Sequence, residues 1–228
     1  MPNIRTSGWF RLAAAAWVAA LAVPAARAQV SGKVTIAEAG GKEATDVGNA
    51  VVYLEGRGPR AAPTRIEMAL DRRTFAPHVI VVPVGSTVVF PNHDPFNHNV
   101  FSLSDPNAFD LGLYGRGEKG EHRFRRAGVV QVYCNIHPQM AGFILVRDNA
   151  YYAQPGADGT YTIENVAPGK YTLHVWHERT PEVTAEIEVP DGGLTDQNVT
   201  LDASGYHLAT HKNKYGQEYG SGASRERY

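Results

Sequence analysis

The stretch from Val129 to Val146, VVQVYCNIHPQMAGFILV, places two β-prone runs on either side of a short polar loop. The first run, Val129–Tyr133, is rich in the β-branched and aromatic residues that strands favour, and Cys134 follows it directly. Residues 135–140 are expected to form a tight loop, because Pro138 fixes its own φ and restricts the residue before it. The segment therefore predicts a rigid strand that ends at a cysteine.

Short β-prone runs separated by Gly, Pro, Asn and Asp recur along the chain after residue 29, whereas long helical periodicity is absent. Examples are Ala50–Leu54, His78–Val82 and Ser86–Phe90. Such spacing is typical of β-sandwiches. We therefore expect an all-β protein.

The first 28 residues have the layout of a cleaved secretory signal. Two arginines precede an apolar run, Leu12–Val23, and small residues precede Gln29. The run is shorter than the roughly 20 residues that a spanning helix needs. We expect a signal peptide over residues 1–28, cleavage between Ala28 and Gln29, no membrane span after cleavage, and a chain that is periplasmic or secreted.

The composition limits the possible partners. The 228-residue chain has a formal charge of −1, and without the three arginines of residues 1–28 its 19 basic residues face 23 acidic ones, a charge of −4. A nucleic-acid-binding face is basic, so nucleic acid is not expected as a partner. In an oxidising compartment a single cysteine forms no internal disulfide, so Cys134 is either buried and inert or bound to something.

The residues around this cysteine match a metal site. A thiolate, two imidazoles and a thioether form the ligand set of a mononuclear blue-copper centre. Cys134, His137 and Met140 supply three of these groups within one loop, and His98 lies in a separate polar connection, residues 92–99, that needs only to reach the same end of the sandwich. We predict one type 1 copper ion bound by these four residues.

Competing assignments exist for three of the ligands. His93 lies five residues before His98 in the same polar connection; His98 is favoured because it precedes an asparagine and an alternating strand. Gln139 is an alternative axial oxygen donor to Met140. Cys134 taken alone could be an ordinary buried thiol.

Residues 65–147 resemble a cupredoxin of the plastocyanin and amicyanin kind, a Greek-key sandwich. The loop, with two residues between Cys and His and two between His and Met, is similar to the short loop of amicyanin and to cupredoxins of methylamine utilisation. The residues that carry the resemblance are Phe75-Ala76-Pro77, Val84–Phe90, Asn92, Asp94, His98–Ser102 and the loop CNIHPQM.

This resemblance implies roles for individual residues. Cys134, His98 and His137 would be the strong ligands, Met140 the axial one, and the side chain of Asn99 would tie the two ligand-bearing connections together. Electrons would pass through the exposed edge of His137, in an apolar patch built by Pro95, Phe96, Pro138 and Ala141.

The C-terminal half contains DGTYTIENVAPGKYTLHVWHE, residues 158–178, which resembles a carboxypeptidase regulatory-like domain, a small transthyretin-like β-sandwich with a carbohydrate-binding-like fold. Its first strands are expected within residues 30–60 and its remainder within residues 150–203. The cupredoxin domain, residues 61–149, would then be inserted in one of its loops. In the alternative, residues 30–56 add edge strands to the middle domain, and the two sandwiches are packed side by side.

Residues 204–228 form a polar tail with few aliphatic side chains, and such a composition cannot bury enough surface to order itself. We expect disorder at least beyond Gly220, although Tyr206, Tyr215 and Tyr219 could dock on the body. His207 and His211 are interpreted as tail residues.

The leading hypothesis is an exported blue-copper protein that carries single electrons between redox partners such as a dehydrogenase, a cytochrome or an oxidase. No acid–base pair and no HxH cluster is evident, so an enzyme is not expected. His174 and His177 lie three apart on a strand and point to opposite faces, which favours packing roles over a second metal.

Two other classes remain open. A copper-handling protein would use exposed Met or His arrays, which this sequence hardly offers. A carbohydrate-binding or cell-surface module with glycan contacts would use aromatic residues for stacking, and Trp176, Tyr161 and Tyr171 are the candidates.

Overall fold

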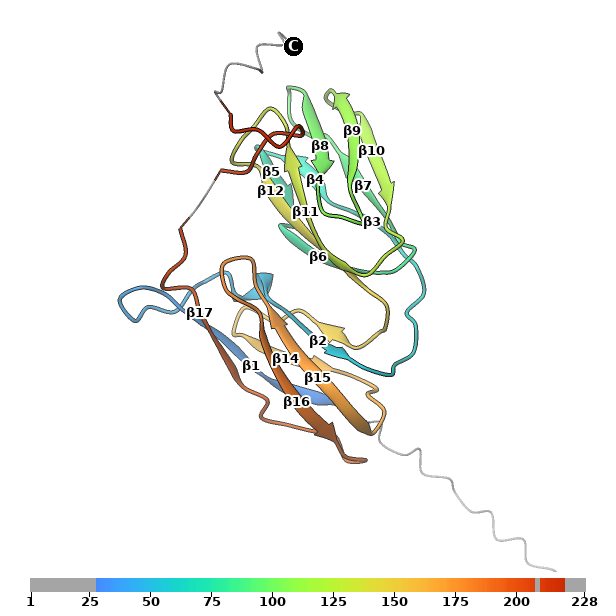
Figure 1. Ribbon diagram of the computed structural model, residues 1–228, viewed down its shortest axis with the longest axis vertical. Helices are drawn as coiled ribbons and strands as arrows, with labels where there is room; N and C mark the ends of the chain where they lie inside the picture. Colours follow the sequence, from blue (N-terminus) through green and yellow to red (C-terminus); the bar gives the residue numbers. More distant parts are fainter. Residues whose placement is uncertain (1–27, 208–209, 220–228) are drawn as a thin grey trace, which may run out of the picture.

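The computed structural model describes residues 28–207 and 210–219, and over these residues the protein is all-β, as predicted (Figure 1). A single 3₁₀ turn, η1 (Val47–Asn49), interrupts the described strands. No helix in these two ranges is long and apolar enough to cross a membrane. The predicted signal peptide, apart from Ala28, and the tail beyond Gly220 lie outside the described residues.

One β-sandwich, which we call the outer sandwich, is built from two sheets. The first has the order β14 (Thr160–Ile163), β1 (Val30–Ala37), β17 (Val199–Asp202), and the second has the order β13 (Tyr152–Ala153), β2 (Val51–Glu55), β15 (Gly169–Trp176), β16 (Val183–Val189).

The other sandwich, which we call the inner sandwich, contains the strands between β2 and β13. Its main sheet has the order β6 (Val79–Pro83), β12 (Ala141–Arg147), β11 (Gly128–Cys134), β8 (His98–Ser102), β9 (Phe109–Tyr114). A smaller sheet has the order β10 (Lys119–Arg123), β7 (Thr87–Pro91), β3 (Arg65–Glu67), and β4 (Ala69–Asp71) pairs with β5 (Thr74–Ala76).

Each sandwich has its own hydrophobic core. Buried residues between positions 28 and 54 join residues 151–203 in one cluster, while residues 68–146 form another. β1 and β2 pair with β14, β17, β13 and β15, so both lie inside sheets of the outer sandwich. This arrangement supports an insertion, and the boundaries at residues 61 and 149 stay a prediction.

The two sandwiches pack through their sheet faces. Val51 and Tyr53 of β2 form a third apolar cluster with Val79 of β6 and Leu145 of β12. At its edge the guanidinium of Arg147 lies 3.5 Å from the centre of the Tyr53 ring. This contact holds the ligand-bearing sheet against the outer sandwich.

A glycine in β1 marks a close approach between backbones. A Cβ atom built at Gly32 would overlap the carbonyl oxygen of Gln197, a backbone atom that cannot rotate away. We expect Gly32→Ala to lower the free energy of unfolding by about 1–3 kcal/mol, the usual cost of overpacking. Urea unfolding checks this.

Gly192→Ala is the matched control, since a Cβ there would meet no atom within 4 Å. Equal stability of the two variants would contradict the packing argument.

Candidate metal centre

Three potential ligands come together at one end of the inner sandwich. His98 is the first residue of β8, Cys134 is the last residue of β11, and these two antiparallel strands pair Cys134 with Val100. The loop from β11 to β12, residues 135–140, carries His137; we call it the ligand loop. His98 and Cys134 are buried, and His137 is half-buried.

The donor atoms of these three residues point at one another. Nδ1 of His98 lies 3.5 Å from Sγ of Cys134, and Nδ1 of His137 lies 3.4 Å from it. All three donor atoms lie within 4.8 Å of one another. Metal–nitrogen and metal–sulfur bonds of about 2.0 and 2.3 Å, meeting at tetrahedral to trigonal angles, would place the nitrogen roughly 3.5–3.7 Å from the sulfur, close to the distances found here. The donor set therefore fits a single metal ion.

Met140, the fourth predicted ligand, closes the ligand loop. Its N–H donates to the carbonyl oxygen of His137 at 2.9 Å, and its own carbonyl oxygen accepts from the N–H of Cys134 at 3.1 Å. Its side chain is buried in the same cluster as Cys134. Gln139, the alternative axial donor, is exposed and lines a cavity outside the metal centre, and His93, the alternative to His98, is also exposed.

Asp94 orients His98, a role that the sequence pattern did not indicate. Its Oδ2 lies 2.9 Å from Nε2 of His98, and its two oxygens accept the N–H groups of Arg72 and Arg73 at 2.7 and 2.9 Å. Both arginines have positive φ, so the carboxylate also stabilises the turn between β4 and β5. A hydrogen bond at Nε2 leaves the lone pair of Nδ1 free for a metal. The available signal was that Asp94 is one of the residues that carry the cupredoxin resemblance.

The ionisation of the site suits metal binding. Burial alone would raise the pKa of Asp94, but the N–H of Arg73, the ring of His98 and the N–H of Arg72 lower it below its ordinary value, so the carboxylate is charged. Desolvation lowers the pKa of His98 and of His137, and burial raises the pKa of the Cys134 thiol. Two neutral imidazoles are thus ready to ligate, and a metal would displace the thiol proton.

Asn99 differs from its expected role. Its side-chain amide donates to Oδ1 of Asp110 at 2.7 Å and does not contact the ligand loop by any hydrogen bond among the described residues. The link between the two ligand-bearing connections is a backbone one, from the N–H of Asn135 to the carbonyl oxygen of Asn99 at 3.0 Å. The reason is geometric: β9 pairs with β8, so the carboxylate of Asp110 on β9 lies within hydrogen-bond distance of the Asn99 side-chain amide.

The residues of the expected apolar patch are divided between two places. The Phe96 ring contacts both ligand rings, with centroids 5.3 Å from His98 and 5.5 Å from His137, and Arg73 lies over its face. Pro95 is exposed. The other two residues, Pro138 and Ala141, line a cavity between the sandwiches.

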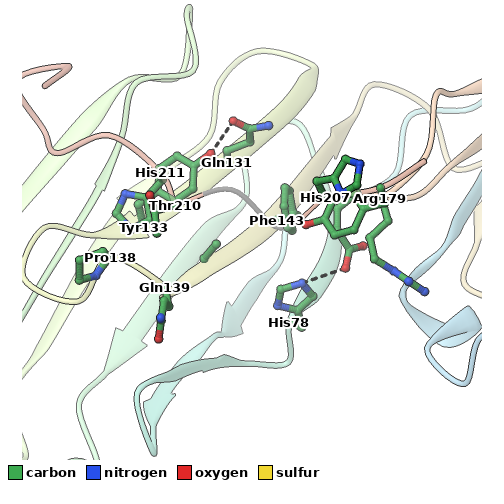
Figure 2. A pocket seen from close by; sticks show the side chains of 13 residues that line it. His78, Gln131, Tyr133, Pro138, Gln139, Phe143, Arg179, His207, Thr210 and His211 are labelled. Carbon is green, nitrogen blue, oxygen red and sulfur yellow. Dashed lines mark hydrogen bonds and ion pairs between the residues drawn. The ribbon is translucent and has the colours of Figure 1, made fainter. Parts of the chain in front are cut away.

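This interface cavity has a volume of about 600 Å³ and adjoins the ligand loop (Figure 2). Tyr133, Pro138 and Gln139 face it from the inner sandwich, and Arg179 faces it from the outer one. The outer sandwich therefore lies across this cavity from the ligand loop.

A second group of metal-ligand residue types lies at the sandwich interface. The donor atoms of Asp46, His177 and Glu178 lie within 4.8 Å of one another. However, the N–H of Arg179 donates to Nδ1 of His177, so the neutral ring carries its proton on Nε2, toward the two carboxylates. A ligating imidazole needs a lone pair at the coordinating nitrogen. We interpret this cluster as a polar packing contact.

Two comparisons with known proteins give limited results. A family model described as polysaccharide lyase family 4, domain II, matches residues 130–197, which span parts of both sandwiches and less than half of the chain. No curated protein matches. The resemblance of the outer sandwich to a carboxypeptidase regulatory-like domain stays a prediction.

Cupredoxins are among the solved structures similar to this chain. A purple cupredoxin from Nitrosopumilus maritimus is 26% identical over 37% of this chain and 99% of its own, with a TM-score of 0.33. A mutant of amicyanin in its reduced state is 21% identical over 42% and 98%, with a TM-score of 0.35. A copper-containing nitrite reductase from Thermus scotoductus SA-01 is 29% identical over 41% and 25%, with a TM-score of 0.36.

These TM-scores are low, so no property of these proteins is transferred to this chain. The candidate metal centre is assigned from the geometry of its own residues. The protein is thus an all-β protein built from two sandwiches. Its inner sandwich holds a candidate metal centre of His98, Cys134 and His137.

Proposed function

We propose that the protein binds one type 1 copper ion and carries single electrons between redox proteins. The observation that carries the proposal is the convergence of two imidazole Nδ1 atoms within 3.5 Å of one buried cysteine sulfur. Thiolate and imidazole donors in a trigonal arrangement with a weak axial thioether suit copper that changes oxidation state. The ligands would be His98, Cys134, His137 and, axially, Met140.

The chain's own residues supply a rigid donor set. Cys134 is fixed at the end of a strand, His98 is held by Asp94, and backbone hydrogen bonds close the ligand loop onto Cys134. Copper, when bound, would alternate between its two oxidation states. A donor set held in place from both connections changes little between those states, and this favours rapid electron exchange.

A titration tests the proposal. Purified protein titrated with Cu(II) should develop an intense charge-transfer absorption near the red end of the visible spectrum that saturates at one equivalent. The colour should disappear on reduction with ascorbate and return on oxidation with ferricyanide. A colourless protein that binds only Cu(I) would favour copper handling instead.

The carbohydrate-binding alternative has less support. Tyr161 and Tyr171 are buried in the outer core and donate their hydroxyls to backbone carbonyl oxygens. Trp176 packs on Phe143 at the sandwich interface. These rings are therefore engaged within the protein, and we place glycan contact second.

We further propose that the protein is exported to the periplasm or secreted, that its partners are redox proteins such as a dehydrogenase, a cytochrome or an oxidase, and that it is not itself an enzyme. Four protein ligands would leave no open position at the copper for a substrate. The carbonyl oxygen of Ala28 accepts the N–H of Val166. Cleavage of the signal between Ala28 and Gln29 would therefore remove this hydrogen bond. N-terminal sequencing of the exported chain would test the cleavage site.

A further inference from the structure

The C-terminal segment, residues 210–219, lies against the inner sandwich, although β17, the last strand before it, belongs to the outer one (Figure 1). It has no regular secondary structure, yet Asn213 within it is buried. Its composition predicted a polar tail that cannot order itself and left open that Tyr206, Tyr215 and Tyr219 dock on the body, so its contacts need an explanation.

Hydrogen bonds join this segment to the ligand loop and to Cys134. The N–H of Lys214 donates to the side-chain oxygen of Asn135 at 2.9 Å. The hydroxyl of Tyr219 donates to the carbonyl oxygen of Cys134 at 3.2 Å. The segment therefore fixes the first two residues at which the chain turns from β11 into the ligand loop.

Ring contacts place His211 against the strands that carry the ligands. Its ring stacks on Tyr133, with centroids 4.3 Å apart and planes at 20°, and meets Phe101 of β8 edge-on at 6.0 Å. Its Nε2 lies 3.4 Å from the carbonyl oxygen of His137. Tyr219 packs against the same ring at 5.4 Å. The pair thus touches both strands and the ligand loop, and Figure 2 shows His211 beside Tyr133.

An ion pair extends the contact to the other ligand-bearing connection. Nζ of Lys214 lies 3.1 Å from Oδ2 of Asp110, whose other oxygen accepts the side-chain amide of Asn99, the neighbour of His98. One short segment therefore contacts the surroundings of all three donor residues.

We propose that residues 210–219 act as a clamp on the ligand loop, and that Tyr219 and His211 are positioning residues of the metal centre. The consequence of the clamp rests on the proposed copper function, whereas its contacts are those described above. Because the ligand loop is held from outside as well as by its own hydrogen bonds, it cannot open readily to release the ion. The clamp should slow copper loss and keep the coordination geometry constant.

Truncation gives the most direct test. A chain ending at Thr210 lacks all of the clamp except its first residue, whereas a chain ending at Tyr219 keeps the clamp and serves as the control. Both are loaded with copper, and its transfer to the Cu(I) chelator bicinchoninate is followed under reducing conditions. We expect the shorter chain to lose copper about 10- to 100-fold faster, the usual effect of removing groups that orient metal ligands.

A single hydroxyl gives a finer test. Tyr219→Phe keeps the ring but removes the hydrogen bond to Cys134, so copper loss should accelerate roughly 3- to 10-fold, as one ordinary hydrogen bond implies. The visible band and the copper hyperfine splitting in electron paramagnetic resonance should shift. Tyr215→Phe is the control, because Tyr215 is 64% exposed and its hydroxyl makes no hydrogen bond among the described residues. It should behave as wild type.

The outcomes separate the clamp from the copper assignment. If both truncated chains hold copper equally well and share one spectrum, the clamp is wrong and the copper proposal stands. If even the full chain binds no copper, hydrogen exchange of the metal-free protein decides: the amides of Cys134, Asn135 and Met140 should exchange faster in the chain ending at Thr210. Equal exchange would overturn the clamp.

Discussion

Replacing Cys134 with serine is expected to abolish both the intense visible absorption of the copper-loaded protein and its single-electron exchange. The absorption depends on a thiolate bonded to Cu(II), and a serine hydroxyl stays protonated and is a harder, weaker donor. The measurement is the visible spectrum after addition of one equivalent of Cu(II), with ferricyanide oxidation as the second readout.

The fold should survive this substitution. Serine has nearly the shape of cysteine, and the cost is that of a buried hydroxyl without a good partner, about 1–3 kcal/mol. Circular dichroism of the metal-free variant should match wild type. If Cys134→Ser kept the blue colour, the proposed copper centre with Cys134 as a ligand would be wrong.

A pair of histidine variants supplies the control. His98→Ala should also remove the band, because Nδ1 of His98 faces the cysteine sulfur. His93→Ala should keep the band, since His93 is exposed and lies in the same connection. If the two variants gave the reverse result, the copper ligand would have been assigned to the wrong histidine.

Asp94→Ala is expected to have the second-largest effect. The carboxylate is the acceptor for the N–H groups of Arg72 and Arg73 and for Nε2 of His98. Without it these donors lose their partner, which should cost on the order of 3 kcal/mol of unfolding free energy. Because the ring of His98 is then free to turn, copper affinity should fall about 10- to 100-fold.

Urea unfolding of the metal-free protein and competition with a chelator measure these two effects separately. Asp71→Ala is the matched control in the neighbouring turn. Its ion pair with Arg72 is solvent-exposed, so its loss should cost less than about 1 kcal/mol. Copper affinity of Asp94→Ala equal to that of Asp71→Ala would rule out an orienting role for Asp94.

Much of the fold was predictable, because its signals are local. The run Val129–Tyr133 and the alternation of Tyr171, Leu173 and Val175 appear as β11 and as the buried face of β15. The donor types at residues 134, 137 and 140 could likewise be recognised from their spacing, and the structure brings His98 and His137 into contact with Cys134.

Other features depend on where distant strands meet. The side chain of Asn99 bonds to Asp110 because β9 lies beside β8. Tyr161, a candidate for sugar stacking, is a core residue because β14 and β15 face each other across the outer sandwich.

The sequence by itself determined the strand pattern and the chemistry of the donor set, since both depend on residue types at short spacing. The sequence favoured His98 over His93, and the tertiary structure places His98 against Cys134. Only the tertiary structure decided that Asp94 orients His98 and that a polar C-terminal segment contacts the ligand loop. Those contacts depend on distances between segments that are far apart in the chain, and neither composition nor local spacing determines such distances.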